Sequence, residues 1–125
     1  MAAGTLVSSG SSLNMPTGSG SERLCRASIH ALNNDTQIIL SGTAGHIYTI
    51  LSVTFSDRQG AAGTIAMTAI TGGPGIYVLN ATSHAALATF VFNDKFVIEE
   101  DDDLDVYNSV TDGDWYLTYI DQDWT

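Results

Sequence analysis

The chain has 125 residues, of which 44% are hydrophobic and 9% aromatic, and this size and composition suit one domain with a hydrophobic core. Its 14 Asp and Glu residues outnumber its 4 Lys and Arg residues, and the net charge of -10 repels phosphate backbones and anionic lipid head groups. We therefore expect no nucleic acid and no membrane surface as a partner.

The first 22 residues, MAAGTLVSSGSSLNMPTGSGSE, are rich in Gly and Ser and have few large apolar side chains, namely Leu6, Val7, Leu13 and Met15. This composition is typical of an extended arm, so we divide the chain into an arm (1–22) and a folded domain (23–125). The arm could fold back on its own domain or lie on a neighbouring subunit. A segment with so few core residues favours the second arrangement, in which the arm lies on a neighbouring subunit. These four side chains are therefore the predicted assembly contacts.

From Leu24 onward, apolar and polar residues alternate with a period of two, which predicts strands. In 46–57 the alternation places Ile47, Leu51, Val53 and Phe55 on one face, and Tyr48 mostly on the other. The same pattern, rich in β-branched and aromatic residues, predicts further strands at 24–32, 36–40, 63–70, 76–82, 88–92, 95–99, 104–110 and 114–120.

Turn residues separate these strands. Asp112-Gly113 predicts a two-residue hairpin between 104–110 and 114–120, and further turns are expected at 33–35, 57–60 and 72–75. No segment has the pattern of a helix. Eight or nine short strands without alternating helices indicate an all-β fold, an antiparallel β-sandwich of the jelly-roll or immunoglobulin-like kind, with an extended N-terminal arm.

Five consecutive acids, Glu99 to Asp103, interrupt the apolar pattern and raise the question of a metal or catalytic site. A helix-loop-helix calcium site counted from Asp101 would need Gly and Glu where Val106 and Asp112 stand, so that motif is absent. A looser calcium site remains an alternative. The favoured interpretation is a solvated connection between strands, which offers no apolar pocket for acid-base catalysis by Glu99 or Glu100.

The histidines and the cysteine do not form a catalytic or metal motif. His30, His46 and His84 lie at least 16 residues apart, so only the fold or a threefold axis could gather them, and positions at the surface or at a sheet edge are favoured. Cys25 alternates with Ala27 and Ile29, which predicts a buried thiol. We therefore predict no catalytic, cofactor-binding or metal-binding residue, and no enzyme.

Four aromatic residues near the C-terminus, Trp115, Tyr116, Tyr119 and Trp124, admit two interpretations. Because Trp115, Leu117 and Tyr119 share one strand face, a role in the core or in a subunit contact is favoured. The alternative is a platform of aromatic rings that stacks on a glycan, as in a carbohydrate-binding module.

Taken in order, the strand phrases resemble small β-sandwich structural proteins of tailed bacteriophage virions. The phrases that carry this resemblance are IYTILSVTFSD (47–57), TIAMTAI (64–70), IYVLNA (76–81), TFVFNDKFVIEE (89–100), LDVY (104–107) and LTYIDQDW (117–124). In that pattern Gly follows the strand ending in Glu-Glu, whereas Asp101 stands there in this chain, and Asp tolerates a left-handed backbone better than most residues.

The resemblance implies a non-enzymatic virion component, made in the host cytoplasm, without a cofactor. It points first to a decoration or cement protein on the capsid, a homo-oligomer such as a trimer whose partners are the major capsid protein or neck and tail subunits. A neck, baseplate or fibre-attachment subunit is the alternative within this class. The opening residues MAAGTLVSSG have neither the basic nor the apolar region of a secretory signal, in agreement with synthesis in a cytoplasm.

Overall fold

The computed structural model describes residues 4–12, 20–32, 36–69, 75–100 and 102–125, with the backbone alone described in 4–12. These residues contain no helix, and therefore none that could span a membrane. The strands are β1 (Gly4–Ser12), β2 (Glu22–Ala31), β3 (Gln37–Ser41), β4 (His46–Asp57), β5 (Gly63–Ala69), β6 (Ile76–His84), β7 (Thr89–Phe92), β8 (Phe96–Glu99), β9 (Asp103–Asn108) and β10 (Gly113–Asp123).

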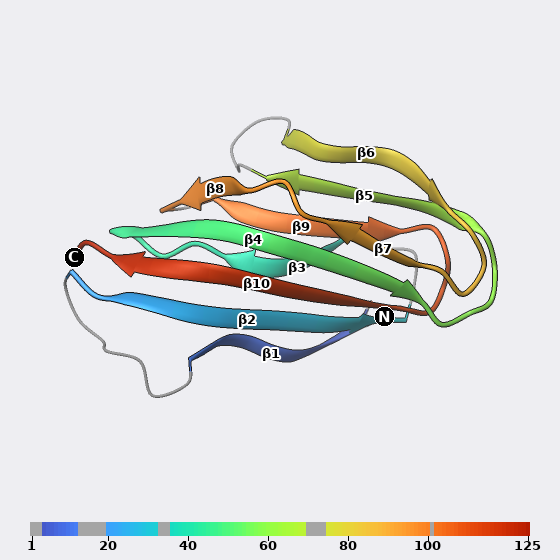
Figure 1. The fold of residues 1–125 in the computed structure, drawn as a ribbon, viewed down its shortest axis with the longest axis horizontal. Coiled ribbons are helices and arrows are strands. Elements are labelled where there is room, and N and C mark those ends of the chain that lie inside the picture. Colours follow the sequence, from blue (N-terminus) through green and yellow to red (C-terminus); the bar gives the residue numbers. More distant parts are fainter. Residues whose placement is uncertain (1–3, 13–19, 33–35, 70–74, 101) are drawn as a thin grey trace.

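The strands form two antiparallel sheets that pack face to face (Figure 1). Sheet A has the order β1-β2-β10-β4-β7, and β8 also pairs with β4; sheet B has the order β3-β9-β5-β6. β7 and β8 are two halves of one edge, since β7 pairs with the second half of β4 and β8 with its first half. The predicted β-sandwich is therefore confirmed.

The pairing of strands identifies the sandwich as a jelly roll. From β2 to β10 the pairs are nested: β2 with β10, β3 with β9, β4 with β7 and β8, and β5 with β6. The chain thus forms one long antiparallel ribbon, and wrapping this ribbon brings β10 beside β4 and β5 beside β9 to complete the sheets. Of the two predicted kinds of sandwich, the structure has the jelly roll.

The core lies between the sheets and is formed by alternate residues of every central strand. Its largest fully buried side chains are Trp115, Tyr119, Phe55, Ile39, Ile50, Ile65, Met67, Ile98, Leu104, Leu117, Val53 and Val106. The predicted faces of 46–57 are wrong in the first half of the strand, where Tyr48 is buried. A register shift between Thr118 and Tyr119 of β10 leaves one extra residue in β4, so the inward and outward positions exchange there.

Asp57 holds the connections at one end of the sandwich. Its carboxylate accepts hydrogen bonds from the backbone N–H groups of Gln59 (2.9 Å), Ala61 (3.1 Å) and Leu87 (2.8 Å). The connections 58–62, 85–88 and 109–112 meet here, and we call this the Asp57 end. Burial disfavours the charged carboxylate, but the three N–H donors outweigh burial and lower the pKa of Asp57 below its ordinary value.

The N-terminal segment requires a correction. Residues 4–12, expected to lie on a neighbouring subunit, form β1 and pair with β2 of the same chain, with Leu6 opposite Ile29. Without β1, one edge of β2 would leave backbone N–H and C=O groups unpaired, and backbone pairing with them does not require large apolar side chains. Val7 also lies in β1, whereas Leu13 and Met15 lie outside the described residues, so the role of all four in assembly stays a prediction.

The predicted hairpin at Asp112-Gly113 is wrong. β9 and β10 belong to different sheets, and Gly113 is the first residue of β10, paired with both Ala31 and Asp57. A Cβ atom at position 113 would lie 2.5 Å from a ring carbon of Phe55. Glycine is therefore needed here for packing and not for a turn.

Candidate functional site

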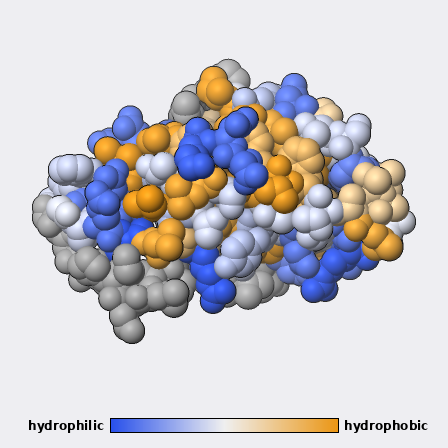
Figure 2. Space-filling model, in the orientation of Figure 1, coloured by the Kyte–Doolittle hydropathy of each residue, from blue (hydrophilic) through white to orange (hydrophobic). Residues whose placement is uncertain are grey.

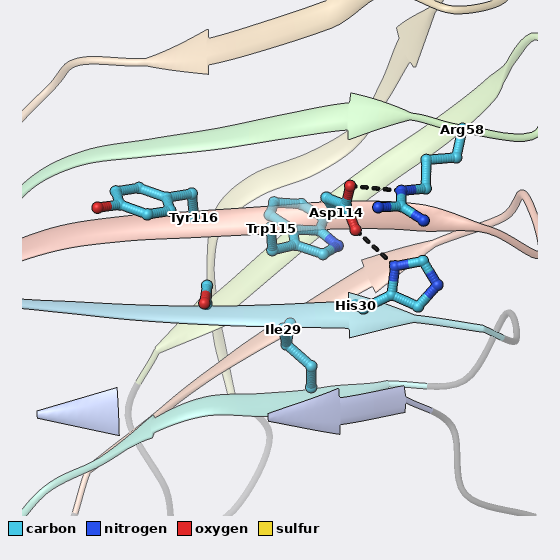
Figure 3. A pocket seen from close by; sticks show the side chains of 7 residues that line it. Ile29, His30, Arg58, Asp114, Trp115 and Tyr116 are labelled. Carbon is cyan, nitrogen blue, oxygen red and sulfur yellow. Dashed lines mark hydrogen bonds and ion pairs between the residues drawn. The ribbon is translucent and has the colours of Figure 1, made fainter. Parts of the chain in front are cut away.

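A shallow hollow of about 460 Å³ lies on the outer face of sheet A near the Asp57 end (Figure 3). Strands β2 and β10 position its polar groups, because His30 pairs with Asp114 and Ser28 pairs with Tyr116 across the two strands. The hollow is lined by Ser28, Ile29, His30, Arg58, Asp114, Trp115 and Tyr116.

Ion pairs occupy the polar side chains of this hollow. Asp114 lies between two partners, His30 Nδ1 at 2.7 Å and Arg58 Nε at 2.6 Å, as Figure 3 shows. The second ring nitrogen of His30, Nε2, lies 3.1 Å from Oδ1 of Asp112. Both nitrogens of His30 therefore face carboxylates.

Ser28, His30 and Asp114 are the residue types of a catalytic triad, but their arrangement does not provide one. A nucleophilic serine needs an imidazole nitrogen free to accept its proton. Here Asp114 and Asp112 face both nitrogens of His30, and Arg58 further engages Asp114. The network is suited to joining β2, β10 and the turn after β4.

A second polar cluster lies at the opposite end of the sandwich, around Asp121. This buried carboxylate pairs with the guanidinium of Arg23 and accepts a hydrogen bond from His46 Nδ1 at 2.7 Å, while His46 Nε2 lies 3.6 Å from Asp123. The hydrogen bond with Asp121 raises the pKa of Arg23. This cluster was not among the predicted sites, although the alternation Trp115, Leu117, Tyr119 continues to Asp121 and so places a carboxylate on the core face.

The structure does not bring the three histidines together. The described residues contain no group of His, Cys, Asp and Glu side chains that could hold a metal ion. His30 and His46 lie in the two clusters above, whereas His84 is 7% exposed and packs its ring against Phe55, with centroids 5.2 Å apart. His84 ends β6, an edge strand of sheet B, which agrees with the predicted edge position, but its side chain is buried and not at the surface.

Cys25 is buried with Ala27, Ile29 and Ala31, which confirms its predicted environment. Burial raises the pKa of the Cys25 thiol, so the reactive thiolate is disfavoured. Burial likewise raises the pKa of its neighbour Tyr119. Neither group has the electropositive, accessible setting that a nucleophile requires.

The acidic run forms a turn between β8 and β9, which confirms the favoured interpretation. The N–H of Asp102 donates to the carbonyl oxygen of Glu99 at 2.9 Å, and the N–H of Glu99 donates to the Asp102 side chain at 3.1 Å. Glu100 adopts the left-handed conformation with φ 45°. Asp101 stands where the pattern of the similar phage virion proteins has Gly, and it lies outside the described residues.

The four C-terminal aromatic residues do not form a platform. Trp115 and Tyr119 are each 1% exposed and belong to the core, whereas Tyr116 and Trp124 are exposed. Tyr116 and Trp124 are eight residues apart along one chain direction, a separation of roughly 27 Å in an extended strand. The favoured core position is confirmed for Trp115 and Tyr119, and a glycan platform built on them is wrong.

The outer face of sheet A carries an apolar row that runs straight across four strands. Leu24 of β2 pairs with Ile120 of β10, Ile120 pairs with Thr49 of β4, and Thr49 pairs with Val97 of β8. Leu24 is 51% exposed and Val97 is 55% exposed. Figure 2 shows hydrophobic residues gathered between hydrophilic ones on the face in view. We call Leu24, Thr49, Val97 and Ile120 the apolar row.

No protein-family model matches the sequence, and no curated protein sequence matches it significantly. Among solved structures, a pentameric capsid protein isolated from metagenomic phage sequences is 12% identical with a TM-score of 0.43, over 78% of this chain and 61% of that chain. This chain therefore spans less than two thirds of the length of that capsid protein.

Two further solved structures also match this chain weakly. A protein of the disulfide-linked pili of Bacillus endospore appendages is 15% identical with a TM-score of 0.47, over 90% of this chain and 100% of that chain. The CBM22-1 xylan-binding domain of Paenibacillus barcinonensis Xyn10C is 14% identical with a TM-score of 0.41, over 94% of both chains. At these values the likenesses carry no argument about what this chain binds.

Proposed function

We propose that this chain is a non-enzymatic structural component of a bacteriophage virion, a decoration or cement subunit that assembles with copies of itself and with neighbouring capsid subunits. The class of protein comes from the strand phrases that resemble tailed-phage virion proteins. The observation that carries an assembly role is the apolar row on the outer face of sheet A.

In a monomer, the side chains of Leu24 and Val97 at the ends of the apolar row are about half exposed to water. Leu24 and Val97 stand at opposite ends of the row, with Ile120 and Thr49 between them, so the row crosses sheet A from β2 to β8. Complete burial of an aliphatic side chain stabilises a contact by about 1.5 to 3 kcal/mol relative to full exposure, and these half-exposed side chains could supply part of that. An apolar row on the outer face of a sheet suits packing against another subunit.

The free edge of β1 offers a second contact. β1 pairs with β2 on one side, and its opposite backbone edge has no partner strand among the described residues. Such an edge can pair with an extended segment of another chain through main-chain hydrogen bonds. In the proposed assembly, the arm contributes backbone hydrogen bonds from the free edge of β1. The outer face of sheet A contributes side-chain contacts through the apolar row.

A catalytic role has little support in the two polar clusters. Each histidine of these clusters is engaged by carboxylates, and the thiol of Cys25 is buried. These arrangements join strands of the sandwich and leave no free nucleophile-base pair between their members.

The experiment compares particles that lack this chain with the same particles after the purified chain is added. The chain is expected to sediment with the particles, and the double variant Leu24→Asp/Val97→Asp should bind at least about tenfold more weakly, a loss of about 1.4 kcal/mol. Ile38→Asp is the matched control, because Ile38 is 51% exposed on the outer face of sheet B.

Failure of the wild-type chain to bind any particle would contradict the proposal. Equal binding by the double variant and the wild type would reject the face of sheet A as the contact. Binding to isolated tails and not to heads would assign the chain to the neck, baseplate or fibre attachment.

A further inference from the structure

A second hollow, of about 260 Å³, lies on the outer face of sheet B, away from the apolar row and from the hollow beside His30. Three neighbouring strands, β9, β5 and β6, supply most of its walls, and Thr36 precedes the fourth strand, β3. The hollow is lined by Thr36, Ala66, Thr68, Tyr77, Asp105, Val106 and Tyr107.

The cross-strand pairing explains why a hollow forms here. Thr68 of the central strand β5 pairs with Asp105 on one side and with Tyr77 on the other, so these three residues form one row. In the adjacent row Ala66 pairs with Tyr107. Small side chains on β5 thus form a floor, and larger side chains on β9 and β6 rise on either side of it.

Asp105 brings an unsatisfied hydrogen-bond acceptor to this hollow. Its Oδ1 atom is shielded from solvent and has no hydrogen-bond partner among the described residues. The ion pairs of the described residues do not include Asp105 either. Burial, and then the negative charge of Asp103, raise the pKa of Asp105, and a hydrogen-bond donor at this partly exposed carboxyl group would offset part of the cost of its burial.

The ligand that fits these groups must donate hydrogen bonds, present an apolar face and carry no negative charge. Tyr77 is 58% exposed and Tyr107 is partly buried, so aromatic surface is available on both sides of the floor. The net charge of -10 and the adjacent Asp103 repel anions. We propose that this hollow binds a neutral carbohydrate, with a hydroxyl group of the sugar donating to Asp105 and the ring stacking on the exposed Tyr77.

A cation is the competing ligand, since a carboxylate and tyrosine rings can also hold an ammonium group. The hydroxyl groups of Thr36, Thr68 and the two tyrosines favour the sugar. Hydroxyl groups both donate and accept hydrogen bonds, and sugar hydroxyls can satisfy both roles. A primary ammonium only donates, and a quaternary ammonium forms no such hydrogen bond, so either would leave the donors of the hollow without a ligand partner.

The proposal goes beyond a structural role, because it gives the chain a glycan-binding face whether or not it belongs to a virion. The test is a titration of the isotope-labelled full-length chain, followed by backbone amide NMR signals. The probes are glucose, galactose and N-acetylglucosamine with their oligosaccharides, tetramethylammonium as the cation and sialic acid as the anionic sugar.

We expect at least one neutral sugar to shift the amide signals of Thr68, Asp105 and Tyr107 in a saturable manner. Sialic acid, which is anionic, should shift none of these signals. Tyr77→Ala and Asp105→Asn should each weaken that binding at least about tenfold. Tyr116→Ala is the matched control, because Tyr116 is 44% exposed on the outer face of sheet A, and it should bind as the wild type does. Unchanged far-ultraviolet circular dichroism verifies that each variant is folded.

Several results would overturn the proposal. These are no saturable shift with any neutral sugar, sugar binding that persists in both Tyr77→Ala and Asp105→Asn, and binding that is lost in Tyr116→Ala instead. Saturable shifts with tetramethylammonium alone would assign the hollow to a cationic ligand and would equally overturn it. Because these measurements use the isolated chain, they are independent of the particle-binding experiment.

Discussion

The indole Nε1 of Trp115 donates a hydrogen bond of 3.0 Å to Oδ1 of Asn108, and both side chains are buried. This bond joins the two sheets, because Asn108 ends β9 in sheet B and Trp115 lies in β10 of sheet A. The amide group of Asn108 also donates to the carbonyl oxygen of Val110 at 2.7 Å. One buried amide thus satisfies two groups where the chain crosses between the sheets.

Replacing Asn108 with Ala should lower the free energy of unfolding by about 1 to 3 kcal/mol, because a buried indole N–H and a carbonyl oxygen lose their partner. Urea denaturation measures this change. Asn80→Ala, at an exposed position of β6, is the control and should remain within about 0.5 kcal/mol of the wild type. Similar losses in the two variants would show that the inter-sheet hydrogen bond contributes little.

Replacing Gly113 with Ala should destabilise the fold by about 1 to 3 kcal/mol, because the new methyl group would overlap the ring of Phe55. The test is a double-mutant cycle with Phe55→Leu, a smaller side chain. We expect Gly113→Ala to cost distinctly less in the Phe55→Leu background. An equal cost in both backgrounds would assign the need for glycine to backbone conformation.

Asp57→Asn should change how stability depends on pH. The folded state lowers the pKa of Asp57 below its unfolded value of about 3.9. The contribution of the charged form is therefore fully present above that value and is lost as the pH falls through the lower, folded-state pKa. Unfolding free energies measured from pH 7 to pH 2 should fall less steeply below about pH 4 in Asp57→Asn than in the wild type.

Asp94→Asn is the control for this pH dependence, since Asp94 is exposed between β7 and β8. Its unfolding free energy should follow the wild-type pH profile. If Asp57→Asn also follows that profile, the three N–H donors do not stabilise the charged carboxylate.

Asp121→Ala should destabilise the protein by about 3 kcal/mol, because Arg23 would remain partly buried without its partner. The double variant Arg23→Met/Asp121→Leu removes both charges and should lose less than the single variant. Asp114→Ala provides the comparison, since Asp114 also has a histidine and an arginine partner but is 40% exposed, and its loss should be below about 1 kcal/mol. Equal losses in Asp121→Ala and Asp114→Ala would contradict a role for burial.

The sequence predicted the central strands because their residues alternate between a buried core and solvent. It did not predict β1, because GTLVSSGSS has no such alternation and its pairing depends on the backbone of β2. The prediction of a hairpin at Asp112-Gly113 was wrong for a different reason. A glycine that is required by the nearby ring of Phe55 looks the same in the sequence as a glycine that is required by a turn.

The candidate sites depend on which strands are neighbours, and the alternation of apolar and polar residues within each strand does not show the order of the strands. Thr68 meets both Asp105 and Tyr77 because β5 lies between β9 and β6, although these residues are far apart along the chain. The apolar row likewise requires the order of sheet A. Asp121 is the exception, because the alternation along β10 alone placed a carboxylate on the core face.

The proposal that this chain is a structural subunit of a virion is tested most directly by electron cryomicroscopy of phage particles purified from a host that produces the chain. We expect symmetry-related density that fits the jelly roll, with Leu24 and Val97 of the apolar row covered by a neighbouring subunit. Particles that lack such density, together with absence of the chain from their protein composition, would contradict the claim.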